Sequence, residues 1–324
     1  MSEARASLVF GIGFSHGSMK ISGKYVVIFL AGLAGLFGLT RHFSAPALTQ
    51  KEVDALYASP NIVAAGPQAV FHIGHSLVGR DMPAMLAQMA GQGHHYDSQL
   101  GWGTTLKAHW EPDTPITGFE QENDHPRYRD AHEAVDSGAY DALVLTEMVE
   151  IRDAIKYFDS ATYLQKWANA GWAANPNLRV YLYESWHSLE TPEGWLDRLD
   201  KDLSRYWDQK ILRPALAGLD EQRPIYVIPA GQVMARFVRT VEAQSGVAER
   251  SALFSDDVHV NDLGAYLVAL THYAVLYQKS PVGLPYALLR ADGSPATSPS
   301  PEMALLMQEV VWEVVGSISK AGLP

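Results

Sequence analysis

The chain has 324 residues, of which 47% are hydrophobic and 19% charged, and its formal net charge at neutral pH is −11. This composition is typical of a globular protein with a full hydrophobic core, and the acidic balance argues against binding to nucleic acid, which needs clustered Lys and Arg. The sequence contains no cysteine, which excludes disulfides, a thiol nucleophile and a Cys-ligated metal.

The first 47 residues have the pattern of an export segment. An uncharged apolar run spans residues 25–39, with Lys20 and Lys24 before it and Ala45-Pro-Ala47 after it. A basic stretch, a short apolar core and an Ala-x-Ala site are typical of a secretory signal peptide. We therefore expect residues 1–47 to be an N-terminal extension with a signal peptide or, if uncleaved, a signal anchor. Translation could begin at Met1 or at Met19.

This pattern predicts a protein that is exported, either periplasmic or extracellular, or tethered to the membrane by its N-terminus. The run is shorter than the roughly 20 apolar residues of a usual spanning helix. Contact with a membrane is expected only through this segment. Residues 48–67 are expected to lead into the domain, with a short capped helix at 49–58.

Strand-like and helix-like segments then alternate along the chain. The strands are expected at 68–73, 95–100, 142–145, 178–183 and 224–228, and the helices at 83–90, 128–135, 163–175, 195–219, 232–242 and 263–277. Such alternation favours parallel strands with right-handed crossovers and helices on both faces. The sequence therefore predicts an α/β protein, a three-layer α/β/α sandwich around a flavodoxin-like sheet of five parallel strands.

This domain is expected to occupy residues 68–279. The remainder, 280–324, begins with a stretch rich in Pro, Ser and Gly. It ends in a segment with helical apolar spacing, 303–317, which is expected to pack on the domain.

Two short motifs far apart in the sequence carry residues for nucleophilic chemistry. Gly74-His-Ser76-Leu follows the first strand, and Asp256-Asp-Val-His259 precedes the last helix of the domain. A serine hydroxyl becomes a nucleophile when a base takes its proton, and the base needs a third group to hold its tautomer. Ser76 is also just past the carboxyl end of a strand, where such sheets bind ligands.

Other interpretations of these residues are structural. Ser76 could cap the helix that begins near Asp81, and His259 could be a surface or capping histidine. An α/β-hydrolase is disfavoured, because Val78 stands where the Gly-x-Ser-x-Gly elbow has its second glycine, and because the acid lies only three residues before the histidine.

The two motifs, in this order and context, resemble those of the SGNH (GDSL-type) esterases and acylhydrolases over about residues 68–278. The resemblance implies that Ser76 is the nucleophile, His259 the general base and Asp256 its orienting acid. It also implies an oxyanion hole made by the backbone N–H of Ser76 and that of Gly101 or Gly103. The family's third donor, an asparagine after the third strand, is absent, and Glu147 stands near its place.

Several polar and aromatic residues near the expected strand ends are candidate substrate contacts: His75, Trp102, Glu147, Glu184 and Trp186. Core packing is the alternative for the tryptophans. No metal site and no cofactor are expected, since His72 and His75 should point to opposite faces of a strand and no helical His-Glu-x-x-His occurs.

These features predict an exported serine esterase that hydrolyses small acyl esters through a Ser-His-Asp triad, with acetyl on carbohydrate as the candidate substrate. The expected partner is a small-molecule or polysaccharide ester, and not nucleic acid. Two alternatives remain open. The acceptor could be another hydroxyl instead of water, or the chain could be a catalytically weak glycan-binding component of envelope polysaccharide assembly.

Overall fold

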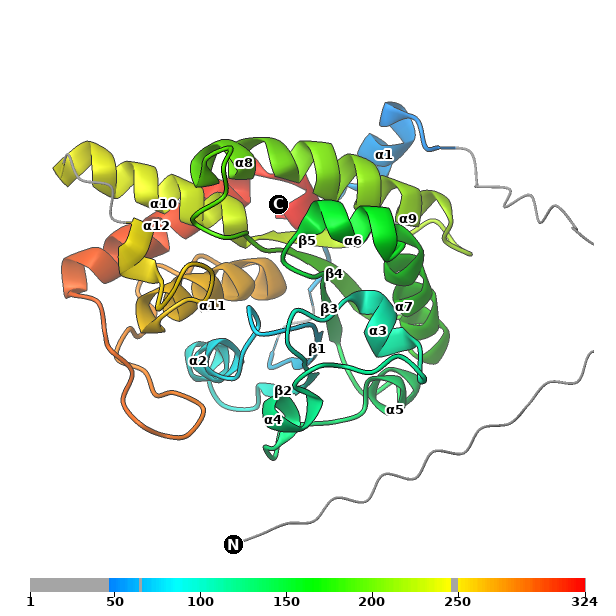
Figure 1. Cartoon of the computed structure of the whole chain (residues 1–324), viewed down its shortest axis with the longest axis horizontal. Helices are drawn as coiled ribbons and strands as arrows, with labels where there is room; N and C mark the ends of the chain where they lie inside the picture. Colours follow the sequence, from blue (N-terminus) through cyan, green and yellow to red (C-terminus); the bar gives the residue numbers. More distant parts are fainter. Residues whose placement is uncertain (1–46, 64–65, 246–249, 324) are drawn as a thin grey trace, which may run out of the picture. The chain divides into compact units, whose positions relative to one another are not determined.

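Five parallel strands in the order β2-β1-β3-β4-β5 form the centre of the fold (Figure 1). They are β1 Ala69–Ile73, β2 His95–Gln99, β3 Ala142–Thr146, β4 Arg179–Glu184 and β5 Tyr226–Pro229. Every residue of β3 is buried, as expected for a central strand that is covered on both faces. The predicted α/β sandwich with a five-stranded parallel sheet is confirmed.

The computed structural model describes residues 47–63, 66–245 and 250–323. The expected export segment, with its apolar run at 25–39 and its flanking Lys20 and Lys24, lies outside the described residues. Within the described ranges, no helix combines the length and the apolar character needed to cross a bilayer.

One face of the sheet is covered by α2 Asp81–Ala90, α10 Ala230–Ser245, α11 Asp262–Tyr277 and α12 Pro301–Ser317, together with part of α8 Trp195–Asp202. Strand residues with alternate numbers, such as Val70 and Val144, point into this core. The residues between them, such as Phe71 and Leu145, point into the second core.

The second core is closed by the helices of the opposite face. These are α3 Leu106–Trp110, α5 Ala131–Asp136, α6 Ile151–Tyr157, α7 Ser160–Ala174, η1 Leu203–Leu212 and α9 Arg213–Ala217. Figure 1 shows α2, α11 and α12 on one side of the sheet and α3, α5 and α7 on the other. Helix α11 is buried nearly all round, which explains its continuous apolar sequence.

Several elements differ from their predicted bounds. The single helix expected at 195–219 is divided into α8, the π-helical η1 of 10 residues and α9. The helix expected at 128–135 begins only at Ala131, because Asp130 is its N-cap and accepts a hydrogen bond from the Glu133 N–H at 3.0 Å. Periodicity alone does not report such local hydrogen bonding.

The ends of the described chain pack against the sandwich. Helix α1, Gln50–Leu56, begins with a capping box formed by Thr49 and Glu52. Helix α12 shares a hydrophobic core with α10 and α11, and Gln308 Nε2 donates to the Tyr266 hydroxyl at 2.8 Å. Three short elements complete the set: α4 Phe119–Asn123, η2 Arg250–Leu253 and η3 Ser319–Ala321.

Candidate active site

Ser76 lies on the turn between β1 and α2, at the carboxyl edge of the sheet. Gly74 allows the chain to leave β1 close to β3, because a Cβ there would lie 2.8 Å from the Thr146 Cβ. His75 then turns inward and is fully buried. Ser76 is therefore left as the partly accessible polar residue of this turn.

His75 is held by two hydrogen bonds. Its Nε2 donates to the Glu147 carbonyl at 2.8 Å, and its Nδ1 accepts from the Leu77 N–H at 3.3 Å. Burial lowers the pKa of His75 to about 4, so the ring is neutral at neutral pH. Both ring nitrogens have partners within the protein, so this ring fixes the nucleophile turn and is not accessible to a substrate.

A chain of hydrogen bonds links Ser76, His259 and Asp256. Ser76 Oγ lies 2.9 Å from His259 Nε2, and His259 Nδ1 lies 2.7 Å from Asp256 Oδ2. The side chains of His259 and Asp256 are 45% and 50% exposed, so a substrate can reach them from solvent. This is the geometry in which a histidine can take the serine proton while the carboxylate holds its tautomer.

Asp256 is fixed as a carboxylate by the backbone around it. Its Oδ1 accepts from the N–H of His259 at 2.6 Å and of Val258 at 2.8 Å. These backbone hydrogen bonds, with the bond from the His259 ring, lower the pKa of Asp256 to about 2. Asp257 instead accepts from Ser188 Oγ at 2.9 Å. The structure thus pairs His259 with Asp256, the residue that the three-residue spacing predicted.

The turn that carries His259 is tied down at both ends. Phe254 and Val260 form an antiparallel bridge, and Asn261 caps α11 by accepting from the N–H groups of Leu263 and Gly264. Only glycine fits at 264, where a Cβ would lie 2.3 Å from the Leu253 carbonyl oxygen. The histidine is therefore placed by a capped helix rather than by a free loop.

The loop between β4 and α8 supports the same turn from the side. Trp186 Nε1 donates to the Val258 carbonyl at 2.7 Å, and the Leu189 N–H donates to the Asp257 carbonyl at 2.7 Å. Trp186 is only 1% exposed. The expectation that it contacts a substrate is not supported by this placement; its contacts position the base.

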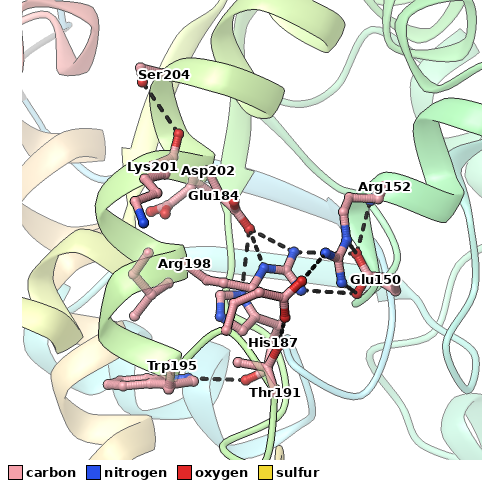
Figure 2. A network of polar contacts seen from close by, with 12 residues as sticks. Glu150, Arg152, Glu184, His187, Thr191, Trp195, Arg198, Lys201, Asp202 and Ser204 are labelled. Carbon is pink, nitrogen blue, oxygen red and sulfur yellow. Dashed lines mark hydrogen bonds and ion pairs between the residues drawn. The ribbon is translucent and has the colours of Figure 1, made fainter.

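A partly buried charge network lies beside that loop (Figure 2). Arg152 ties the network to the loop by an ion pair with Glu193 at 2.6 Å. Arg198 donates to Asp202 Oδ2 at 2.7 Å and to Glu150 Oε2 at 3.0 Å. Glu150 is also paired with Arg152 at 2.9 Å. Two arginines lower the pKa of Glu150 to about 2 against the cost of its partial burial. The segments that follow β3 and β4 are thus joined through one guanidinium.

Gly101 and Gly103 follow β2, the neighbour of β1. Ile73 pairs with Gln99, and the Gly74 N–H donates to the Gln99 carbonyl at 3.2 Å, so the segment after β2 leaves the sheet beside the Ser76 turn. The N–H groups of Ser76, Gly101 and Gly103 donate to no other described residue. Each is therefore available as an oxyanion donor.

The two positions require glycine for different reasons. A Cβ at Gly101 would lie 2.2 Å from Thr104 Oγ1 and from Ile116 Cγ2, so close packing requires glycine there. Gly103 has open space around it but a φ of 55°, which other residues adopt only under strain.

Glu147 follows β3, near the place of the family asparagine, but its carboxyl group turns into the protein. It is fully buried, and Oε1 accepts from the N–H groups of Met148 at 2.8 Å and Leu106 at 3.4 Å. Burial raises the pKa of Glu147 to about 7. The expected substrate contact is not supported by this orientation; the side chain joins β3 to the start of α3.

The remaining two candidate substrate contacts, Glu184 and Trp102, differ in burial. Glu184 is buried and accepts from Gln232 Nε2 at 3.0 Å, and burial raises its pKa to about 8. Trp102 is 50% exposed and donates through Nε1 to Glu122 at 2.7 Å. Of the five predicted substrate contacts, Trp102 alone presents substantial surface to solvent.

Two residues that sequence reasoning did not single out help to shape the site. His109 is buried and its Nε2 donates to the Gly74 carbonyl at 2.8 Å, while Asn123 Nδ2 donates to the Leu100 carbonyl at 2.8 Å. Both act on backbone groups from a distance in sequence, so no local pattern marks them. Across the ranges that the structure describes, no three His, Asp or Glu side chains converge as metal ligands.

The sequence matches no protein-family model and no curated protein. Among solved structures, the chain is similar to a DUF4886 family protein from Bacteroides uniformis, with 14% identity and a TM-score of 0.51 over 77% of this chain and 95% of that one.

Two other structures show a weaker likeness. A GDSL-like lipase from Parabacteroides merdae has 13% identity and a TM-score of 0.40, over 68% of this chain and all of that one. A carbohydrate esterase family 2 enzyme from Corynascus thermopiles (Myceliophthora fergusii) has 11% identity and a TM-score of 0.39, over 67% and 68%. At these identities the likeness is one of fold, and the chain has the flavodoxin-like α/β/α fold that the SGNH resemblance implies.

Proposed function

We propose that this protein is a serine esterase of the SGNH type that hydrolyses small acyl esters. The observation that carries the proposal is the hydrogen-bond chain from Ser76 through His259 to Asp256, which joins residues 183 positions apart in the sequence. The motifs around these residues, with their resemblance to the SGNH family, support the same assignment. Export through residues 25–39 is part of the proposal.

In the proposed reaction, His259 Nε2 takes the Ser76 hydroxyl proton as Oγ attacks the ester carbonyl carbon. The tetrahedral intermediate carries its negative charge on the former carbonyl oxygen. The N–H of Ser76 and that of Gly101 or Gly103 donate to this oxygen. His259 then gives the proton to the departing alkoxide, which leaves as an alcohol, and Ser76 holds the acyl group.

Deacylation repeats these steps with water. His259 takes a proton from water, the hydroxide adds to the acyl carbon, and the proton returns to Ser76 Oγ as the acid is released. Asp256 stays ionised throughout and stabilises the imidazolium that forms twice in each cycle. A second hydroxyl compound that replaced water would give acyl transfer with the same residues.

Turnover of p-nitrophenyl acetate tests this proposal. We expect Ser76→Ala to lower kcat/KM at least 10³-fold with an unchanged unfolding temperature, because the nucleophile is lost and no buried contact is removed. A fluorophosphonate probe should label the wild type and not this variant. Ser137→Ala is the matched control, since Ser137 precedes β3 at the opposite edge of the sheet.

Equal turnover by the wild type and Ser76→Ala, with no labelling of either, would refute the esterase. That result would favour the glycan-binding alternative, in which the fold is kept without catalysis.

A further inference from the structure

A pocket of about 290 Å³ opens next to the candidate oxyanion glycines. Its wall is made by residues 102–105 after β2, by the segment 114–117, by Met148 after β3 and by the end of α6. Gly103 itself lines it. No residue of the Ser76 turn lines the pocket, but β2 and β3 flank β1, so the segments after them leave the sheet at the same edge as that turn.

Two aromatic rings border the pocket with much of their surface free. Trp102 is 50% exposed and Tyr157 is 57% exposed. The Trp102 ring is fixed, since its Nε1 donates to Glu122 and a Cβ at Gly118 would lie 2.2 Å from the ring. Fixed, accessible rings with a polar edge are suited to packing against the C–H face of a sugar.

Threonine residues also line the pocket. The Oγ1 of Thr104 is buried next to Gly101, so a ligand in the pocket does not reach it. Thr114 and Thr117 line the pocket from the opposite segment and supply hydroxyl groups to its wall.

Lys107 is the charged residue that lines this pocket, and no Asp or Glu lines it. Its ammonium group lies 5.7 Å from the centre of the Tyr163 ring, and it forms no ion pair within the described part of the chain. A lysine without an ion pair on the wall of a pocket favours an anionic ligand group, and here it stands out against a net charge of −11.

We propose that this pocket binds a sugar residue with an anionic substituent, as part of the ester substrate on which Ser76 acts. Trp102 and Tyr157 contact the ring, the hydroxyl groups of Thr114 and Thr117 bind sugar hydroxyls, and Lys107 pairs with the anionic group. The inference rests on the proposed esterase function, because it makes this sugar the carrier of the acyl group or its neighbour in a glycan. The substrate class is then an acylated acidic carbohydrate.

Binding to the Ser76→Ala variant tests the pocket without turnover. Titration calorimetry compares trigalacturonate, which is acidic, with xylotriose, which is neutral. We expect trigalacturonate to bind more tightly and Lys107→Met to weaken it about tenfold, an effect of about 1.4 kcal/mol, with xylotriose unchanged. The preference should shrink in 0.5 M salt, since ion pairs at an open pocket are screened. Trp102→Ala should weaken both sugars.

Lys166→Met is the matched control, because the Lys166 ammonium lies over the same Tyr163 ring at 4.5 Å but does not line the pocket. The inference is overturned if trigalacturonate fails to bind or binds no better than xylotriose, or if Lys107→Met and Lys166→Met have the same effect. Such results leave the esterase standing if Ser76 still hydrolyses p-nitrophenyl acetate. If the wild type does not hydrolyse p-nitrophenyl acetate while the sugar binds as expected, the esterase proposal is refuted instead.

Discussion

At the scale of single residues, burial decides what each polar side chain near Ser76 does. His75 and Glu147 stand at the sequence positions of substrate contacts, yet each is fully buried and bonded to backbone groups. They are linked to one another, because the His75 ring donates to the Glu147 carbonyl. The two residues therefore set the geometry between the nucleophile turn and the segment after β3, while Ser76, His259 and Asp256 face solvent.

Asp256 holds the base through His259 Nδ1. We expect Asp256→Asn to lower kcat for p-nitrophenyl acetate about 10³- to 10⁴-fold, because an amide can favour the wrong imidazole tautomer. Asp257→Asn is the control and should cost less than tenfold, since Asp257 bonds to Ser188 and not to the base. Equal losses in the two variants would contradict the assignment.

Glu147 gives the free energy of unfolding a distinct pH dependence. Its pKa is about 7 in the folded protein and 4.5 as the ordinary value. The folded state keeps a proton that the unfolded state releases, so the stabilisation is complete below pH 4.5 and is lost as the pH rises through 7. The shift corresponds to about 3 kcal/mol.

Urea unfolding at pH 4.5 and pH 8 measures this effect. We expect the wild type to lose about 3 kcal/mol more than Glu147→Gln between these two pH values, because glutamine does not ionise but keeps an acceptor for the Met148 N–H. Parallel pH dependence in both proteins would show that Glu147 does not titrate in this range.

At the scale of elements, the site depends on how the segments after the strands are joined. The loop after β4 holds the His259 turn through Trp186 and Leu189, and it is itself anchored beside Arg198 on α8 (Figure 2). The side chain of Arg198 is 5% exposed, and its carboxylate partners come from α8 and from the segment after β3. Helix α8 and the segment after β3 thus meet at one guanidinium.

We expect Arg198→Met to destabilise the protein by about 3–5 kcal/mol, because Asp202 and Glu150 lose their shared cation and Asp202 stays buried. Arg239→Met is the control: Arg239 pairs with Asp200 at the surface, and its loss should cost less than about 1 kcal/mol. Chemical denaturation compares the two. Similar losses would mean that the network is no stronger than a surface ion pair.

At the scale of the whole molecule, part of the hydrophobic core lies away from the proposed catalytic groups. The proposed catalytic groups lie at the carboxyl edge of the sheet, whereas α12 packs on α10 and α11 over one face. Helix α12 packs on α11, which places His259 at its N-terminal end, but α12 supplies none of the hydrogen bonds between the side chains of Ser76, His259 and Asp256.

Val311 in α12 is fully buried, and Leu305 in the same helix is 45% exposed. We expect Val311→Ala to lower the free energy of unfolding by about 2 kcal/mol through lost packing, and Leu305→Ala by less than about 1 kcal/mol. Both variants should keep the wild-type kcat. A fall in kcat for Val311→Ala at a temperature where it is folded would contradict this separation.

Periodicity and short motifs identified all five strands and the three-layer class, and they singled out the Ser, His and Asp that the structure brings together. These follow from local chemistry, since alternating apolar residues, caps and turn residues leave their pattern in the chain itself. The breaks within 195–219 and the late start of α5 could not be predicted in this way, because they depend on hydrogen bonds and contacts that the pattern of residues does not record.

The order of elements, and the presence of a serine, a histidine and an aspartate at places suited to catalysis, can be read from the sequence. Only the folded chain shows that Ser76 and His259 meet and that His75, Glu147, Glu184 and Trp186 face inward. The reason is physical: propensity acts between near neighbours in the chain, whereas burial and hydrogen-bond partners are set by packing between segments far apart in sequence.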